Sequence, residues 1–153
     1  MTLVKDQIAT WPVKPILIEP GSNAQAHRQK RAAFQAADVA LAASGTVSLE
    51  LAATLTPTVI AYDMGFLSRQ IIGRMLKVET VSLVNLITDS KSIPEFIAEN
   101  CQEELITPSV LKLLDDPRGQ IQAMQSTMQA LGQNGHPPGE RAAQSVIKFL
   151  AAQ

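Results

Sequence analysis

Three consecutive residues, Ser44, Gly45 and Thr46, could together bind an anion. They lie between a short apolar run and a segment with helical spacing. Serine and threonine are favoured as helix N-caps, and glycine lets the backbone adopt a positive φ and approach a ligand closely. The free N–H groups of the next helical turn would point into this turn, where the helix dipole also attracts negative charge. The pattern therefore predicts binding of a phosphate or diphosphate.

Glu50 adds a carboxylate close to this turn. It lies between Leu49 and Leu51 on an otherwise apolar segment and follows Thr46 by four residues, so it faces the same end of the helix. Such a carboxylate could be solvated or could cap the helix, or it could accept two hydrogen bonds from a sugar diol. Charge-assisted hydrogen bonds contribute about 1.5–3 kcal/mol each. We favour the sugar diol.

A strand, a turn, a helix and a second strand are expected to position these groups. Residues 38–43 form a short run of small and apolar residues without polar alternation, which is typical of a strand buried on both faces. Val47 and Leu51 show helical spacing, and Pro57 ends the helix. Thr58–Tyr62 is a second apolar strand. A helical crossover makes the two strands parallel and places the turn at the carboxyl edge of the sheet, where open α/β sheets bind ligands.

Asn85 and Glu95 are two further polar residues with alternative interpretations. Asn85 follows an expected strand at Val81–Leu83, so it would lie at the same edge of the sheet and contact a ligand, or it could simply close a turn. Glu95 follows Pro94, a pair that predicts the start of a short helix and explains the carboxylate without a ligand.

The remaining pattern predicts an α/β domain with flanking helices. The expected elements are a strand at Pro15–Pro20 and helices at about 23–37, 66–76, 108–115, 119–131 and 139–152. The net charge of −1 gives no indication of nucleic acid as a partner. The single Cys101 excludes an internal disulfide and fits a reducing compartment. We expect no metal and no cofactor, because the two histidines have no metal-ligand spacing.

Three stretches carry a resemblance to a known family: ALAASGTVSLELA, TPTVIAY and VSLVNLITDSKSIPEF. From about Lys30 to its end, the chain resembles the C-terminal part of lipid-A-disaccharide synthases. The resemblance implies the Rossmann-like C-terminal half of a two-domain (GT-B) glycosyltransferase. Such enzymes join UDP-2,3-diacylglucosamine to 2,3-diacylglucosamine 1-phosphate and release UDP. The resemblance further implies a UDP-sugar site, whose residues in this chain would be Ser44, Gly45, Thr46, Glu50, Asn85 and Glu95.

The resemblance also implies that the chemistry is shared with a part outside these 153 residues. The general base and the acyl-chain pockets would belong to an N-terminal acceptor domain, so no catalytic residue is assigned here. The chain also departs from the family pattern at four positions, which are Asp63, Val84, Ser90 and Ala98.

Residues 1–135 are expected to form an incomplete UDP-sugar-binding domain, and residues 136–153 a linker and a crossing helix. That helix has an apolar stripe, made of Ala142, Ala143, Val146, Ile147 and Leu150. The stripe requires a partner, which would be the N-terminal domain or a second subunit of a homodimer. A cytoplasmic location is expected, with contact to the inner membrane surface as an open alternative.

Two other functions remain open from the sequence. The first is a non-catalytic nucleotide-binding or assembly module, which the four departures would suit. The second is another UDP-sugar transferase, such as the one acting on the peptidoglycan lipid precursor, although the Asn85-Leu86 and Pro94-Glu95 pairs argue against it.

Overall fold

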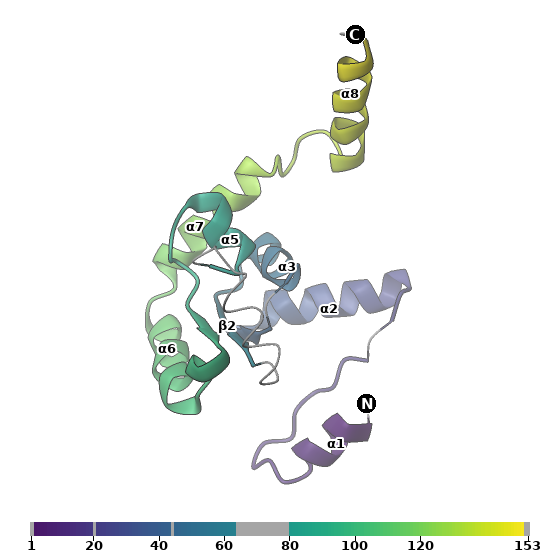
Figure 1. The fold of residues 1–153 in the computed structure, drawn as a ribbon. Helices are drawn as coiled ribbons and strands as arrows, with labels where there is room; N and C mark the ends of the chain where they lie inside the picture. The colour runs from purple at the N-terminus through teal and green to yellow at the C-terminus, as the bar shows by residue number, and fades with distance from the viewer. Residues whose placement is uncertain (1, 20, 44, 64–79, 152–153) are drawn as a thin grey trace. The chain divides into compact units, whose positions relative to one another are not determined.

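A computed structural model describes residues 2–19, 21–43, 45–63 and 80–151 (Figure 1). The chain forms two compact units, Met1–Ala37 and Asp38–Gln153. Ser44 and the helix expected at 66–76 lie outside the described residues.

The first unit contains two helices, α1 (Thr2–Ile8) and α2 (Ala24–Ala36). The expected helix after Asn23 is confirmed, and the Asn23 side chain caps it by accepting a 2.8 Å hydrogen bond from the Ala26 N–H. The strand expected at Pro15–Pro20 is wrong, because residues 15–19 are not in a strand and Ile16 is 92% exposed. A strand needs a neighbour for its backbone groups, and the described part of this unit contains no other strand.

The second unit is built on a three-stranded parallel sheet in the order β1-β2-β3. Its strands are β1 (Ala40–Ala42), β2 (Thr58–Tyr62) and β3 (Glu95–Ile97). Helix α3 (Val47–Thr54) connects β1 to β2. The strand–turn–helix–strand pattern and the parallel pairing are therefore confirmed. The first strand, β1, is shorter than expected, and the expectation that it is buried on both faces is wrong, because Leu41 is 60% exposed.

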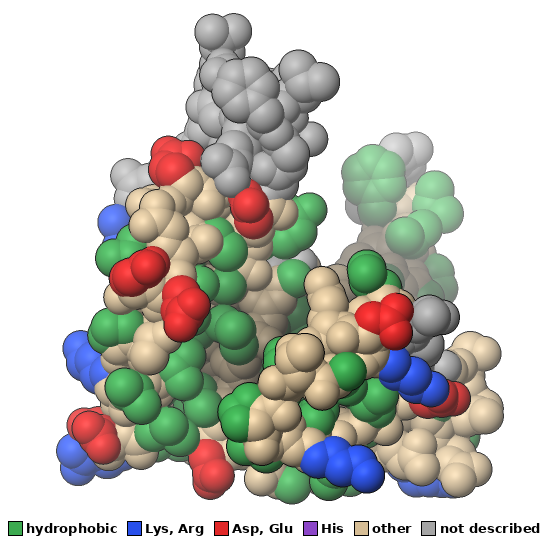
Figure 2. All heavy atoms as spheres, turned by 90° about the horizontal axis from the view of Figure 1, so that it is seen from below, with side chains coloured by type: hydrophobic (Ala, Val, Ile, Leu, Met, Phe, Trp, Pro, Cys, Tyr) green, Lys and Arg blue, Asp and Glu red, His purple; other side chains and the backbone are tan. Residues whose placement is uncertain are grey.

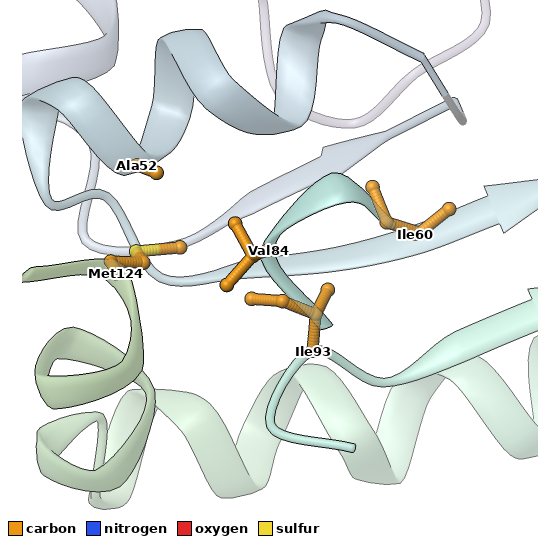
Figure 3. Packing of buried hydrophobic residues seen from close by; sticks show 5 residues of the cluster. All are labelled: Ala52, Ile60, Val84, Ile93 and Met124. Atoms are coloured by element: carbon orange, nitrogen blue, oxygen red, sulfur yellow. The ribbon is translucent and has the colours of Figure 1, made fainter. Parts of the chain in front are cut away.

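One face of the sheet is covered by α3, α5 (Leu83–Thr88) and α7 (Arg118–Ala130), which pack against one another. Figure 3 shows the buried cluster that joins these elements: Ala52, Ile60, Val84, Ile93 and Met124. The adjacent residue on β2, Val59, points to the opposite face and is also fully buried. Helix α6 (Glu103–Asp115) packs against β2.

Two expected elements between β2 and α6 are wrong. Val81–Leu83 is not a strand, because Leu83 begins α5 and the backbone N–H groups of Val81 and Ser82 donate to the Glu95 carboxylate. Glu95 does not begin a helix but is the first residue of β3, paired with Ile60. Pro94 is tolerated just before the strand, because its carbonyl can still accept a 2.9 Å hydrogen bond from the Ile60 N–H.

The C-terminal helices follow the expected pattern, with one early start. Helix α6 begins at Glu103 and contains Pro108. The two glutamates in its first turn lie at the positive end of the helix dipole, where negative charge is stabilising. Between α6 and α7, a hydrogen bond from the exposed Arg118 side chain lowers the pKa of Asp116 to about 2. Helix α8 (Pro138–Ala151) is exposed along its described side chains.

Charged and apolar side chains are mixed on the face shown in Figure 2.

Candidate functional site

The turn after β1 has the backbone geometry that the glycine pattern predicts. Gly45 adopts φ +135°, a conformation that L side chains rarely adopt, and the position of a Cβ there would meet no atom within 4 Å. Thr46 is the N-cap of α3, as expected, but its side chain makes no capping hydrogen bond. The buried Ser48 hydroxyl instead donates to the Gly45 carbonyl at 2.9 Å.

The first turn of α3 presents backbone donors at this position. The N–H groups of Ser48, Leu49 and Glu50 donate to the carbonyls of Gly45 and Thr46 at 3.0–3.3 Å. The N–H groups of Thr46 and Val47 precede the first of these bonds, and an α-helix provides no acceptor of its own for such groups. They are suited to an anion, as expected for this turn. The Glu50 side chain is exposed in the same turn.

Asn85 lies within α5 and is 2% exposed. Its side-chain oxygen accepts from the Ile93 N–H at 2.8 Å, and its nitrogen donates to the Ile93 carbonyl at 2.9 Å. The same nitrogen donates to the Thr80 hydroxyl at 3.2 Å and to the Glu95 carboxylate at 3.1 Å. The amide therefore bridges α5, Thr80 and the entry to β3.

The Glu95 carboxylate is the centre of a second set of hydrogen bonds. It accepts from the Thr80 hydroxyl, from the Val81 N–H at 3.0 Å and from the Ser82 N–H at 2.7 Å, besides the Asn85 amide. The Ser82 hydroxyl is fully buried and has no hydrogen-bond partner among the described residues. Asn85 and Glu95 are thus brought together, as neighbours in one network.

The strand register relates this network to the turn. Ala42, Ile60 and Glu95 are aligned across the three strands, so Glu95 is level with the last residue of β1. Neighbouring strands lie about 4.8 Å apart, which places Glu95 roughly 10 Å across the sheet from the start of the turn. Side chains at one level of a parallel sheet point to the same face, so Glu95 lies on the face that α3 and α5 cover.

A cavity of about 350 Å³ lies beside the network. It is lined by Asn85 and Glu95 together with Thr80, Lys91, Asn100 and three apolar residues. Sequence reasoning missed Thr80 and Asn100, which are single polar residues without a local pattern. It also missed Gln120, a buried amide on α7 whose spacing of four residues from the buried Met124 marks a core-facing position.

The chain is similar to a known protein family along most of its length. Residues 15–148 match the family model described as lipid-A-disaccharide synthetase. The chain is 49% identical, over 96% of its length, to the lipid-A-disaccharide synthase of Ruegeria pomeroyi. It is 36% and 37% identical to the enzymes of that name from Nitrobacter hamburgensis and Bradyrhizobium diazoefficiens.

The chain spans 37% of the length of these three relatives. None of the helices in the described residues is long and apolar enough to cross a membrane. The match over residues 15–148 and the identity to several relatives show that the chain belongs to the lipid-A-disaccharide synthase family.

Proposed function

We propose that this chain is the donor-binding part of a glycosyltransferase of lipid A biosynthesis. The full-length protein would join UDP-2,3-diacylglucosamine to 2,3-diacylglucosamine 1-phosphate and release UDP. The observation that carries the proposal is the turn after β1, where Gly45 has a positive φ directly before α3, within a chain of this family.

The turn is proposed to hold the diphosphate. The N–H groups of Thr46 and Val47, at the positive end of α3, suit phosphate oxygens, and Ser44 and Thr46 could add their hydroxyls. These donors would stabilise the negative charge that develops on UDP as the glycosidic bond to it breaks. The role of the turn in catalysis is therefore electrostatic stabilisation of the leaving group.

Glu50 is proposed to bind the ribose. Its carboxylate lies in the first turn of α3, exposed and close along the helix to the diphosphate donors. A carboxylate accepts two hydrogen bonds, which matches the two hydroxyls of a ribose diol. A second carboxylate, Glu95, lines the cavity with Asn85 about two strand spacings away, and we assign both residues to the same donor site.

The acceptor site, the general base and the acyl-chain pockets are proposed to lie in an N-terminal domain. The chain spans 37% of the length of its relatives, which leaves room in the full-length protein for such a domain. The apolar stripe of α8 is proposed to cover part of that domain or of a second subunit, because Val146, Ile147 and Leu150 are each at least 60% exposed. The location is proposed to be cytoplasmic, with contact to the inner membrane surface as the alternative.

Titration calorimetry with UDP on the full-length protein tests the proposed function. Glu50→Ala should weaken UDP binding by about 2–4 kcal/mol, because two charge-assisted hydrogen bonds are lost. Glu104→Ala removes a comparable exposed carboxylate from the first turn of α6 and is the matched control, which should leave the affinity unchanged. Unchanged affinity in Glu50→Ala would reject the ribose role. A wild-type protein that binds no UDP would reject the function.

A further inference from the structure

Two buried side-chain amides make the same unusual contact with the backbone. Asn85 bonds both the N–H and the carbonyl of Ile93, and Gln120 bonds both the N–H and the carbonyl of Thr58. Each side-chain amide therefore pairs with the backbone of one residue in the way that a peptide group of an adjacent strand would. Gln120 also donates to the Ser92 carbonyl at 3.1 Å, so both amides fix the segment that leads into β3.

The two amides differ in their remaining contacts. Gln120 bonds only backbone groups among the described residues, at the start of β2 and before β3. Asn85 also donates to the Glu95 carboxylate, which accepts in every hydrogen bond it makes. Four donors already converge on this carboxylate, and the Asn85 amide uses its oxygen and its nitrogen within the protein.

We infer that Asn85 and Glu95 are positioning residues of the UDP-sugar site, which act through the backbone of residues 80–82 and not by bonding the nucleotide. This inference rests on the proposed function. Residues 80–82 lead directly into α5, and α5 packs against α3, which carries Glu50 and the donor turn. Val84 of α5 and Ala52 of α3 belong to one buried cluster, visible in Figure 3. A shift of residues 80–82 therefore reaches α3 through packed side chains.

Asn85→Asp in the full-length protein tests this role, because it replaces a donor to Glu95 by a second carboxyl group. Two carboxyl groups about 3 Å apart cannot both ionise easily, so one pKa rises and the pair shares a proton at acidic pH. The charged groups lining the cavity are Glu95 and Lys91. Helix α5 carries no charged residue, α3 carries only Glu50, and α7 carries only Arg118, which is exposed and paired with Asp116.

We expect the UDP dissociation constant of Asn85→Asp to rise about tenfold at pH 8, where both carboxyl groups are charged. At pH 5.5 a protonated Asp donates to Glu95 again, and the affinity should return to within about threefold of the wild type at the same pH. Gln120→Glu is the matched control, since it makes the same chemical change in the other buried amide without a carboxylate partner. It should lower the melting temperature and leave UDP affinity unchanged at both pH values.

Amide hydrogen exchange provides a second readout, which does not depend on UDP. Glu95→Gln should speed exchange at the Val81 and Ser82 N–H groups, because the oxygens that accept from them are replaced in part by a donor. Wild-type exchange in this variant would overturn the inference. So would an Asn85→Asp protein that binds UDP like the wild type at pH 8, or equally weakly at both pH values. A wild-type protein that binds no UDP would instead overturn the proposed function, and the inference with it.

Discussion

The turn after β1 and the Asn85–Glu95 network use their polar groups in opposite ways. In the turn, Gly45, Thr46 and Glu50 are exposed, and the N–H groups of Thr46 and Val47 precede the first helical hydrogen bonds. In the network, Asn85 is 2% exposed, and the carboxylate of Glu95 accepts from four donors of the protein.

This difference indicates how a site can be divided between binding and support. Groups that a ligand is to bond must keep some of their hydrogen-bonding capacity free of the protein. Groups that are already paired and buried contribute to the geometry of the fold, and their loss leaves polar partners unsatisfied. We therefore expect substitutions in the turn to affect ligand affinity, and substitutions in the network to affect stability as well.

The largest effect concerns catalysis, for which neither region is expected to supply an acceptor site or a base. The purified 153-residue chain should form no disaccharide from UDP-2,3-diacylglucosamine and the 1-phosphate acceptor, because inverting transfer needs both substrates held in line with a base. Release of UDP and formation of disaccharide are measured together, with the full-length protein as the positive control. Turnover by the chain alone would mean that the second domain is dispensable.

Stability is the next largest effect and separates the two regions. Asn85→Leu should destabilise the chain by about 2–4 kcal/mol, because the Ile93 backbone loses both hydrogen bonds and the Glu95 carboxylate loses one donor. Glu50→Ala should change the free energy of unfolding by no more than about 0.5 kcal/mol, as is usual for exposed positions. Urea denaturation measures both values. Similar losses in the two variants would remove the distinction between the regions.

The conformation of the turn can be tested by two substitutions at Gly45. A Cβ at this position meets no protein atom within 4 Å, so within the protein the substitutions act through φ +135° and not through crowding. Gly45→Ala should weaken UDP binding by about 1–3 kcal/mol, and Gly45→Val should weaken it further, because β-branched residues tolerate positive φ least. Calorimetry on the full-length variants compares them. Equal affinities for the two variants would show that the backbone at residue 45 need not keep this conformation.

The smallest effect on donor binding is expected from α8. Deleting residues 136–153 should leave UDP affinity unchanged, because it removes neither the turn nor the network. It should also make the chain more monomeric, since the exposed Val146, Ile147 and Phe149 would otherwise promote self-association. Light scattering on both lengths of chain measures this. A monodisperse monomer for the undeleted chain would show that the helix needs no partner.

The turn could be predicted from sequence because its determinants are local. Gly45, the helical spacing after Val47 and the proline at 57 lie within a short stretch, and each restricts the backbone by itself. The parallel pairing of β1 with β2 followed from the helical crossover between them.

The network could not be predicted, because its contacts join residues that are distant along the chain. Nothing local indicates that Glu95 accepts from the N–H groups of Val81 and Ser82, or that Gln120 bonds Thr58 from a helix 62 residues later. These contacts changed the local structure itself. The apolar sequence of residues 81–83 predicts a strand, yet the Val81 and Ser82 N–H groups donate to the Glu95 carboxylate and not to a neighbouring strand.

A crystal structure of the full-length protein with UDP would test the division between the two regions most directly. We expect diphosphate oxygens within hydrogen-bond distance of the Thr46 and Val47 N–H groups, and the ribose hydroxyls on the Glu50 carboxylate. We also expect that Asn85 keeps its bonds to Ile93 and that Glu95 keeps its bonds to Val81 and Ser82. A nucleotide bonded directly to the Asn85 amide or the Glu95 carboxylate, with the turn unoccupied, would contradict the account.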